Sequence, residues 1–450
     1  MIEHPTNTES NFHSQLECMD CHSVFPIDSV LFLCPNCQGL LDVHHDVDAL
    51  KKIAADDWKQ RFDERFRKAP YPFNSGVWGK KEWVLPGLDD EAIVSFGEGA
   101  TPLVPVPRLA ESFGVQELWI KQCGISHTGS FKDLGMTVLV SHVNDLIKQG
   151  KPIRAVACAS TGDTSAALSA YGAWANIPVI IFLPEGKITT AQLVQPLANG
   201  ATVLQLNTDF DGCMAVVRDV TADADSGIYL ANSMNPLRIE GQKTVGIEVI
   251  EQMQWSAPDW MVIPGGNLGN VSALAAGFDL LLATGMIQKA PRICVAQAAH
   301  ANPLYQSFQT RFSKYQPVKA KKTLASAIQI GAPVSYKRAV RALERYNGVV
   351  EQAEEGELAD AAALGDRYGL FNDPHTGVAL ACTRKLIQSG VISKTEKVVV
   401  ISTAHGLKFS EFKTCYHQSS LDGIVSAHKN QPISCAADVD SVRRILDQLQ

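Results

Sequence analysis

The chain lacks the features of a secreted or membrane-spanning protein. Its first twelve residues, MIEHPTNTESNF, have neither the basic start nor the apolar stretch of a signal peptide. Its most apolar stretches, such as residues 271–287, are interrupted by Asp279 and by two glycines, so no run of about 20 apolar residues is present. The cysteines number 11, an odd count that fits a reducing compartment better than a disulfide framework. We therefore expect a cytoplasmic protein with no membrane partner.

Basic charge is absent from the first 50 residues, which contain eight acids and no Lys or Arg. A nucleic-acid-binding module needs basic side chains to neutralise phosphates, so this segment argues against a nucleic-acid partner. The sequence also has no evident internal repeat or low-complexity segment. At 450 residues, 46% apolar and 19% charged, it has an ordinary globular composition with room for two or three domains.

Four cysteines form two Cys-x2-Cys pairs, at Cys18, Cys21, Cys34 and Cys37. Two such pairs can present four thiolates tetrahedrally, and we interpret the residues between them as a short hairpin that returns the chain to a metal. The spacing predicts a structural zinc ribbon over residues 1–45. The alternatives are chance pairs or a redox-active pair. His44 and His45 are spare candidate ligands, but four thiolates already complete a tetrahedron.

After a connector over residues 46–100 that we leave unassigned, short apolar runs alternate with segments of helical spacing. Such alternation is typical of parallel sheets that helices cover on both faces. We expect two α/β lobes and a short helix near the C-terminus with an apolar face of Val439, Val442, Leu446 and Leu449. Strands are expected at residues 118–124, 154–160, 178–184, 201–207, 228–232, 259–266, 292–298 and 398–403, and the main helices at 133–150, 164–176, 189–200, 210–224 and 270–287.

Ligands of open parallel sheets bind beyond the carboxyl ends of the strands, so the strand-to-helix loops hold the candidate site residues. The first such loop places Lys132, beside Phe131, at the start of a helix, although a lysine taken alone is more often solvated. The second loop, Ser160-Thr161-Gly162-Asp163-Thr164, offers hydroxyls and free amides to an anion such as a carboxylate. Plain helix capping is the alternative for this loop.

Two further loops complete the set. Residues 265–270 read Gly-Gly-Asn-Leu-Gly-Asn, and the glycines let backbone amides wrap a phosphate. This loop matches neither the dinucleotide-binding nor the nucleoside-triphosphate motif. The strand at 398–403 ends at Thr403, whose hydroxyl can reach a heterocyclic nitrogen. A lysine, a phosphate loop, a carboxylate loop and a hydroxyl together describe a pyridoxal 5′-phosphate site.

Five motifs in order, HTGSFKDLGM, ASTGDTSAA, NSMNPLRIEGQKT, PGGNLGNVSAL and STAHGLKF, resemble those of the threonine synthases, particularly the plant-like branch. That family belongs to the tryptophan synthase β-like (fold type II) enzymes, which use pyridoxal phosphate. The resemblance covers most of residues 40–410. It implies a lyase of threonine biosynthesis, converting O-phospho-L-homoserine and water to L-threonine and phosphate, and it suggests a homodimer.

The resemblance also implies a domain division and a set of site residues. A large cofactor-binding domain is expected from residues 46–132 and 233–415, a small α/β domain from 133–232 and a tail from 416–450. Lys132 matches the Schiff-base lysine, and Thr403 the residue that faces the pyridine nitrogen. The implied cofactor-binding residues are Lys132, Phe131, Asp163, Gly266, Asn267, Leu268, Gly269, Asn270 and Thr403, and the implied substrate-binding residues are Ser160, Thr161, Thr164, Ser233 and Arg238.

Asp163 departs from the family pattern, because many members have Asn at this position. An ionised Asp only accepts hydrogen bonds, so we expect Asp163 to share a proton with the cofactor's 3′-oxygen. The cysteine ribbon is a second departure, since it is not general in the family. We interpret His375 and His405 as structural rather than catalytic.

Three other functions were weighed. A threonine or serine dehydratase also needs a lysine like Lys132 but usually has a Gly-Gly-Gly-Gly-Leu phosphate loop, which this chain lacks. A cysteate synthase acting on O-phosphoserine also needs a substrate phosphate site, so it stays open. A ribbon-bearing nucleic-acid binder with a degenerate enzyme body is disfavoured by the acidic first 50 residues.

Overall fold

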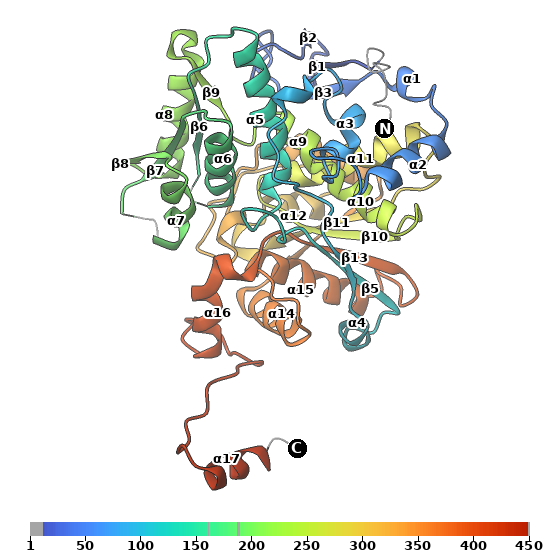
Figure 1. The fold of residues 1–450 in the computed structure, drawn as a ribbon. Helices are drawn as coiled ribbons and strands as arrows, with labels where there is room; N and C mark the ends of the chain where they lie inside the picture. Colours follow the sequence, from blue (N-terminus) through green and yellow to red (C-terminus); the bar gives the residue numbers. More distant parts are fainter. Residues whose placement is uncertain (1–11, 161, 187–189, 449–450) are drawn as a thin grey trace.

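The computed structural model describes residues 12–160, 162–186 and 190–448. Within these ranges the chain forms one sheet of six strands, one of four and one of three (Figure 1). The two larger sheets are mostly parallel and lie among helices, which confirms the expected α/β class. In the ranges described, every helix is too short or too polar to cross a membrane.

The six-stranded sheet has the order β12-β11-β10-β13-β5-β4. β13 lies between β10 and β5 and is parallel to both, so the last strand of the chain lies in the middle of this sheet. β4, which is antiparallel to β5, and β12 were not foreseen from the sequence. The strands are β4 Leu103–Pro105, β5 Glu117–Gln122, β10 Trp260–Pro264, β11 Arg292–Ala298, β12 Val349–Ala353 and β13 Lys397–Ser402.

Helices cover both faces of this sheet. Successive side chains of each strand point to opposite sides, and the apolar side chains on both sides are buried under helices. In β10, Met261 and Ile263 join the core that contains Val271 and Leu274 of α11 (Gly269–Ala283). Trp260 and Val262, which alternate with them, join a second core beneath α15 (Pro374–Gln388). α14 (Glu355–Arg367) and α4 (Pro107–Phe113) lie on the same side as α15 (Figure 1).

The four-stranded sheet has the order β8-β7-β6-β9 and is parallel throughout. α8 packs on one face against Ala157 and Leu230, and α5 and α6 cover the other face, where Val156 and Cys158 are buried. The elements are β6 Ala155–Ala159, β7 Val179–Pro184, β8 Thr202–Leu206, β9 Ile228–Leu230, α5 Lys132–Lys148, α6 Asp163–Trp174, α7 Thr190–Ala198 and α8 Phe210–Ala222.

The N-terminal sheet has the order β2-β1-β3, with β1 Ser14–Cys18, β2 Val24–Pro26 and β3 Leu41–His45. The spacing suggested a hairpin formed by the residues between the cysteine pairs, but these residues form no hairpin of their own. Their strand β2 pairs instead with β1, because the first pair turns the chain back on itself between Cys18 and Ser23. The connector that follows is anchored by four fully buried aromatic side chains, Trp58, Phe62, Trp78 and Trp83.

The helix α17 lies apart from the rest of the molecule at the end of an extended tail (Figure 1). Its Val439, Val442 and Leu446 are exposed, so within the described residues its apolar face covers no core; Leu449 lies outside them. The remaining helices are α1 Val47–Leu50, α2 Ala55–Arg65, α3 Lys81–Val84, α9 Leu237–Gln242, α10 Thr244–Gln252, α12 Pro303–Gln309, α13 Tyr336–Arg345, α16 Ser410–His417 and α17 Val439–Leu446.

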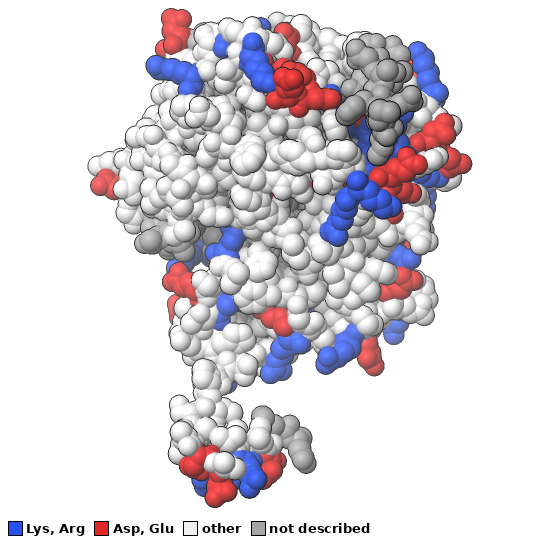
Figure 2. Space-filling view, viewed as in Figure 1, with Lys and Arg blue, Asp and Glu red and all other residues white. Residues whose placement is uncertain are grey.

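Charged side chains are sparse on the face drawn in Figure 2, where small groups of both signs are separated by wide uncharged areas. The described residues on this face therefore offer no continuous basic track to a nucleic-acid backbone.

Candidate active site

Three candidate loops follow neighbouring strands of the six-stranded sheet. Lys132 follows β5, Thr403 follows β13 and residues 266–270 follow β10, and these strands lie side by side. Parallel strands end at the same edge, so the loops meet there. The Phe131 N–H donates to the Thr403 carbonyl oxygen at 2.9 Å, and Ser130 pairs with Ala404 across the gap. The expected alignment of loops at one sheet edge is therefore present.

The other candidate loops follow β6 and β9, which are neighbours in the four-stranded sheet. Ser160 and Thr164 lie after β6, and Ser233 and Arg238 lie after β9. An Arg238 terminal nitrogen donates to Thr164 Oγ1 at 3.2 Å, which joins the two loops directly. Thr161 lies outside the described residues.

Lys132 lies where the two groups of loops meet. It begins α5, which packs against α9, the helix that carries Arg238. Burial, reinforced by the positive charge of Arg238 and opposed by Asp163, lowers the pKa of the Lys132 amine to about 7. The amine lies 4.2 Å from the centroid of the Phe131 ring, and no hydrogen bond or ion pair to it is found in the described part of the chain. The amine therefore loses its proton far more readily than an ordinary lysine, as a nucleophile or base requires.

Residues 266–270 form a cradle at the start of the helix α11. Leu268 has a left-handed φ of 66° and turns the chain into the helix. A side chain at Gly266 would come within 3.0 Å of the Ile328 backbone, so this close approach favours glycine. Among the described residues, no acceptor is found for the backbone N–H groups of residues 266–270. A row of free amides at a helix N-terminus fits a phosphate group.

Arg238 is a buried cation, only 5% exposed, without a carboxylate partner in the described residues. One terminal nitrogen donates to the Ala231 carbonyl oxygen at 3.2 Å, the other to Thr164, and its buried Nε has no partner there. Burial lowers the pKa of its guanidinium to about 10, so it stays charged at neutral pH. A charged group with free donors in a buried position favours the binding of an anion. Ser233 lies half-buried in the same loop.

Thr403 is buried, and the loop that contains it is held by Asp373, a residue that the sequence did not reveal as part of the site. The fully buried Asp373 carboxylate accepts from the Ala404 N–H at 2.9 Å and the Thr376 hydroxyl at 2.6 Å. It also accepts from His375, whose Nδ1 lies 2.6 Å away, and these donors hold the pKa of Asp373 below its ordinary value despite its burial. An Asp before a Pro at the start of an apolar-periodic segment was the signal of this helix start.

Asp163 forms an ion pair with Lys408, a partner that the sequence did not reveal. Lys408 Nζ lies 3.2 Å from an Asp163 carboxylate oxygen and also donates to the Thr128 carbonyl oxygen and to Gln195 Oε1. Lys408 therefore joins the loop before Lys132 to the four-stranded sheet's α6 and α7. The motif STAHGLKF contains Lys408, but nothing in its spacing indicated this contact.

The histidines occupy structural positions. His375 Nε2 accepts from the Ala327 N–H at 3.0 Å while its other nitrogen faces Asp373, and His405 caps the turn that follows β13. His45 is buried against Glu240, with 2.6 Å between its Nε2 and the carboxylate. His45 therefore points to the body of the protein and not to the cysteines.

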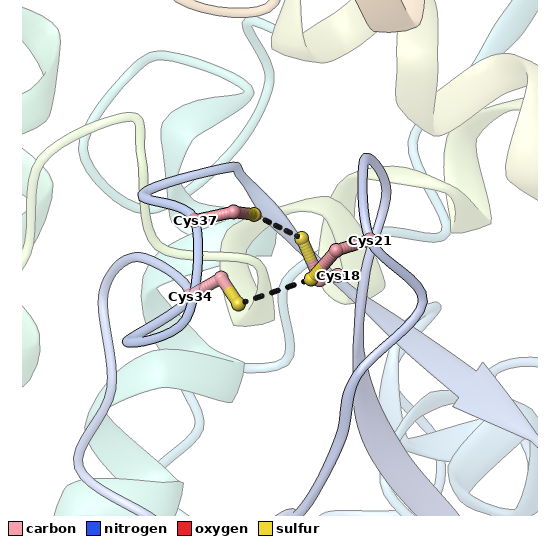
Figure 3. A group of neighbouring side chains, drawn as sticks. All are labelled: Cys18, Cys21, Cys34 and Cys37. Carbon is pink, nitrogen blue, oxygen red and sulfur yellow. Dashed lines mark hydrogen bonds between the residues drawn. The ribbon is translucent and has the colours of Figure 1, made fainter.

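The cysteine pairs come together as the spacing predicted (Figure 3). All four sulfur atoms lie within 4.8 Å of one another, with Cys18 and Cys37 3.4 Å apart and Cys21 and Cys34 3.6 Å apart. Four thiols gathered around one point match the donor set of a structural zinc site.

Comparison with known proteins gives a consistent result. A family model described as pyridoxal-phosphate dependent enzyme matches residues 94–404. The chain is 54% identical over 412 residues to threonine synthase 2, chloroplastic, of Arabidopsis thaliana, covering 91% of this chain and 80% of that protein. It is 36% identical to the threonine synthase of Methanocaldococcus jannaschii, covering 96% of this chain and 99% of the relative.

Solved structures agree at the level of the fold. The crystal structure of threonine synthase from Escherichia coli superposes with a TM-score of 0.66 at 18% identity, over 97% of this chain and 100% of that one. Maize serine racemase superposes with a TM-score of 0.59 at 18% identity, over 76% of this chain and 98% of that one.

The lowered pKa of Lys132 predicts its reactivity. In the cofactor-free protein, acetylation of Lys132 measured by mass spectrometry should rise with pH to a midpoint of about 7. Arg238→Gln should raise this midpoint because it removes a neighbouring positive charge, and Asp163→Asn should lower it because it removes a negative one. The exposed Lys289 serves as the internal control. A Lys132 that titrates together with Lys289, near the ordinary lysine pKa, would contradict this account of the site.

Proposed function

Because the chain belongs to the threonine synthase family of pyridoxal-phosphate dependent enzymes, we propose that it converts O-phospho-L-homoserine and water to L-threonine and phosphate. The observation that carries the substrate assignment is Arg238, a buried cation with free donors and no carboxylate partner in the described residues. The free amides of residues 266–270 would bind the cofactor phosphate, and the loop at residues 160–164 would bind the substrate carboxylate. Arg238 therefore indicates a third anionic group, the phosphate ester of the substrate.

The described residues fit pyridoxal 5′-phosphate. Lys132 would bond it, residues 266–270 would hold its phosphate with their free amides, and Phe131 and Thr403 would flank its ring. When bound, the cofactor withdraws electrons from the substrate's α-carbon. The Thr403 hydroxyl would donate a hydrogen bond to a ring nitrogen without protonating it, which suits an elimination and replacement reaction better than one that needs full electron withdrawal.

Lys132 is the residue that we assign to proton transfer. When it is not bonded to the cofactor, the Lys132 amine is positioned at the site and, with a pKa of about 7 in the protein alone, would be able both to accept and to return a proton near neutral pH. We assign to Lys132 the removal and return of protons at the α and β carbons of the substrate. No other titratable side chain among the candidate residues combines this location with such a pKa.

Two groups of residues would orient the substrate. Ser160, Thr161 and Thr164, at the start of α6, would bind the carboxylate. Arg238 and Ser233 would bind the phosphate, and the hydrogen bond from Arg238 to Thr164 links the two pockets. As the phosphate leaves, negative charge grows on its ester oxygen, and a fixed guanidinium stabilises that charge.

Asp163 is assigned to the cofactor's 3′-oxygen. Two acceptors facing one another require a proton or a compensating cation. Lys408, 3.2 Å from the Asp163 carboxylate, would supply that positive charge. The sharing of a proton between Asp163 and the 3′-oxygen stays a prediction.

The remaining assignments are also proposals. The four cysteines would hold one structural zinc ion, as their sulfur positions support. We retain the division into a ribbon (1–45), a large domain (46–132 and 233–415), a small domain (133–232) and a tail (416–450). A cytoplasmic homodimer stays a prediction from the sequence.

Arg238→Ala should lower kcat/KM for O-phosphohomoserine at least about tenfold, since a charge-assisted hydrogen bond is worth roughly 1.5 to 3 kcal/mol. Both a higher KM and a lower kcat are expected, because the contact strengthens as the phosphate leaves. Phosphate release and threonine formation are the measurements. Arg154→Ala, an exposed arginine at the start of β6, is the matched control. Wild-type kcat/KM in Arg238→Ala, or equal turnover of unphosphorylated homoserine, would contradict the substrate assignment.

Metal analysis of the purified protein should give about one zinc per chain. Cys34→Ser combined with Cys37→Ser should abolish the zinc, because two remaining thiolates do not hold it tetrahedrally. Cys435→Ser, which changes an exposed cysteine in the tail, should leave the zinc content unchanged. Zinc-free protein prepared without chelators would refute this assignment.

A further inference from the structure

The helix α13 lies between the cysteine ribbon and the loop at residues 266–270. The ribbon segment contains acids and no Lys or Arg, and α13 presents three basic side chains to it. Lys337 pairs with Asp20 on the surface at 2.9 Å, and Arg341 donates to the Met19 carbonyl oxygen at 3.3 Å. The third basic residue, Arg338, is 5% exposed and reaches further into the protein.

The Arg338 side chain contacts both the ribbon and the residue that precedes its own helix α13. Its Nε donates to Asp42 Oδ1 at 2.7 Å, and one terminal nitrogen donates to the Leu41 carbonyl oxygen. The other terminal nitrogen lies 3.4 Å from Ser335 Oγ. A planar guanidinium with donors on several sides fixes its partners relative to one another more strictly than an ammonium would.

Ser335 in turn holds the phosphate loop. Its backbone N–H donates to the Asn267 carbonyl oxygen at 3.0 Å, and the neighbouring Val334 N–H faces Asn267 Oδ1 at 3.4 Å. Ser335 is fully buried. These contacts orient the Asn267 peptide within the row of free amides, and they connect Arg338 to the cradle through a single residue.

On the ribbon side, Leu41 is tied to the cysteines. It pairs with Cys18 at the start of the β1–β3 ladder and is fully buried with Cys18 and Cys34. A side chain at Gly39 would come within 2.9 Å of the Cys18 sulfur, so the turn before Leu41 packs directly on this thiol. The position of Leu41 therefore depends on how the four sulfurs are held.

We propose that Arg338 is a positioning residue that couples metal binding in the ribbon to phosphate binding at residues 266–270. The path runs from the cysteines through Leu41 and Asp42 to Arg338, then through Ser335 to Asn267. It rests on the zinc and cofactor sites proposed above. Because linkage between two binding sites is reciprocal, zinc should tighten pyridoxal phosphate binding and the cofactor should slow zinc loss by a related amount.

The test compares two adjacent substitutions in the full-length protein. Arg338→Gln removes the buried link, whereas Lys337→Gln removes an exposed ribbon contact of the same charge that does not reach the phosphate loop. Arg338→Gln should raise the dissociation constant for pyridoxal phosphate about tenfold, within the usual range of coupling between sites. Lys337→Gln should leave it unchanged. The ³¹P resonance of the bound cofactor should shift in Arg338→Gln only.

Zinc release to a chelator provides a readout that does not depend on catalysis. In wild-type protein and in Lys337→Gln, release should be slower with pyridoxal phosphate bound than without it. In Arg338→Gln the two rates should be equal. If Arg338→Gln does not fold, Asp42→Ala, which removes the partly exposed ribbon end of the link, decides the question with the same expected direction.

The outcomes separate this inference from the function proposed above. Wild-type protein that binds both zinc and pyridoxal phosphate, with cofactor affinity unaffected by zinc removal, would overturn the coupling and leave the function standing. Equal effects of Arg338→Gln and Lys337→Gln on cofactor affinity and on the ³¹P resonance would overturn the role of Arg338. Wild-type protein that binds no pyridoxal phosphate would overturn the proposed function itself.

Discussion

The burial of two basic side chains where loops of the two parallel sheets meet is the constraint on which the site depends. Lys132 belongs to the helix that follows the six-stranded sheet's β5, and Arg238 to the helix that follows the four-stranded sheet's β9. Burial lowers the pKa of both, and their mutual repulsion adds to the effect on Lys132. The Lys132 amine becomes available as a nucleophile near pH 7, whereas the Arg238 guanidinium, with a pKa of about 10, keeps its charge and has no carboxylate partner among the described residues. Both conditions favour a substrate and a cofactor that carry anions.

The sequence was sufficient to predict the parts of the site that depend on local order. Strands followed at once by glycine or hydroxyl residues, and then by helices, located Lys132, residues 266–270 and Thr403 at one sheet edge, because parallel strands end together. The Cys-x2-Cys spacing predicted the sulfur cluster for a similar reason, since each pair is a local turn. The family resemblance added Arg238 and Ser233, which periodicity alone did not single out.

The parts that escaped prediction depend on contacts between distant segments. Asp373 supports the Thr403 loop from another helix, Lys408 reaches Asp163 across the two sheets, and α13 connects the ribbon to Asn267. None of these pairs is marked by spacing, because a carboxylate or an amine carries no information about which distant segment of the chain will supply its partner. The apolar face expected for α17 was also a local pattern, and it is exposed in the structure. Periodicity indicates an apolar face without indicating what, if anything, covers it.

Borohydride reduction of the purified protein, followed by peptide mass spectrometry, tests the central claim most directly. Reduction fixes pyridoxal phosphate permanently to the amine that it is bonded to, and each of the chain's lysines lies in a sequence context that peptide mapping can identify. The account predicts a single pyridoxyl group on Lys132 and loss of the visible absorbance band. A label on another lysine, or no label in protein that retains its fold, would contradict it.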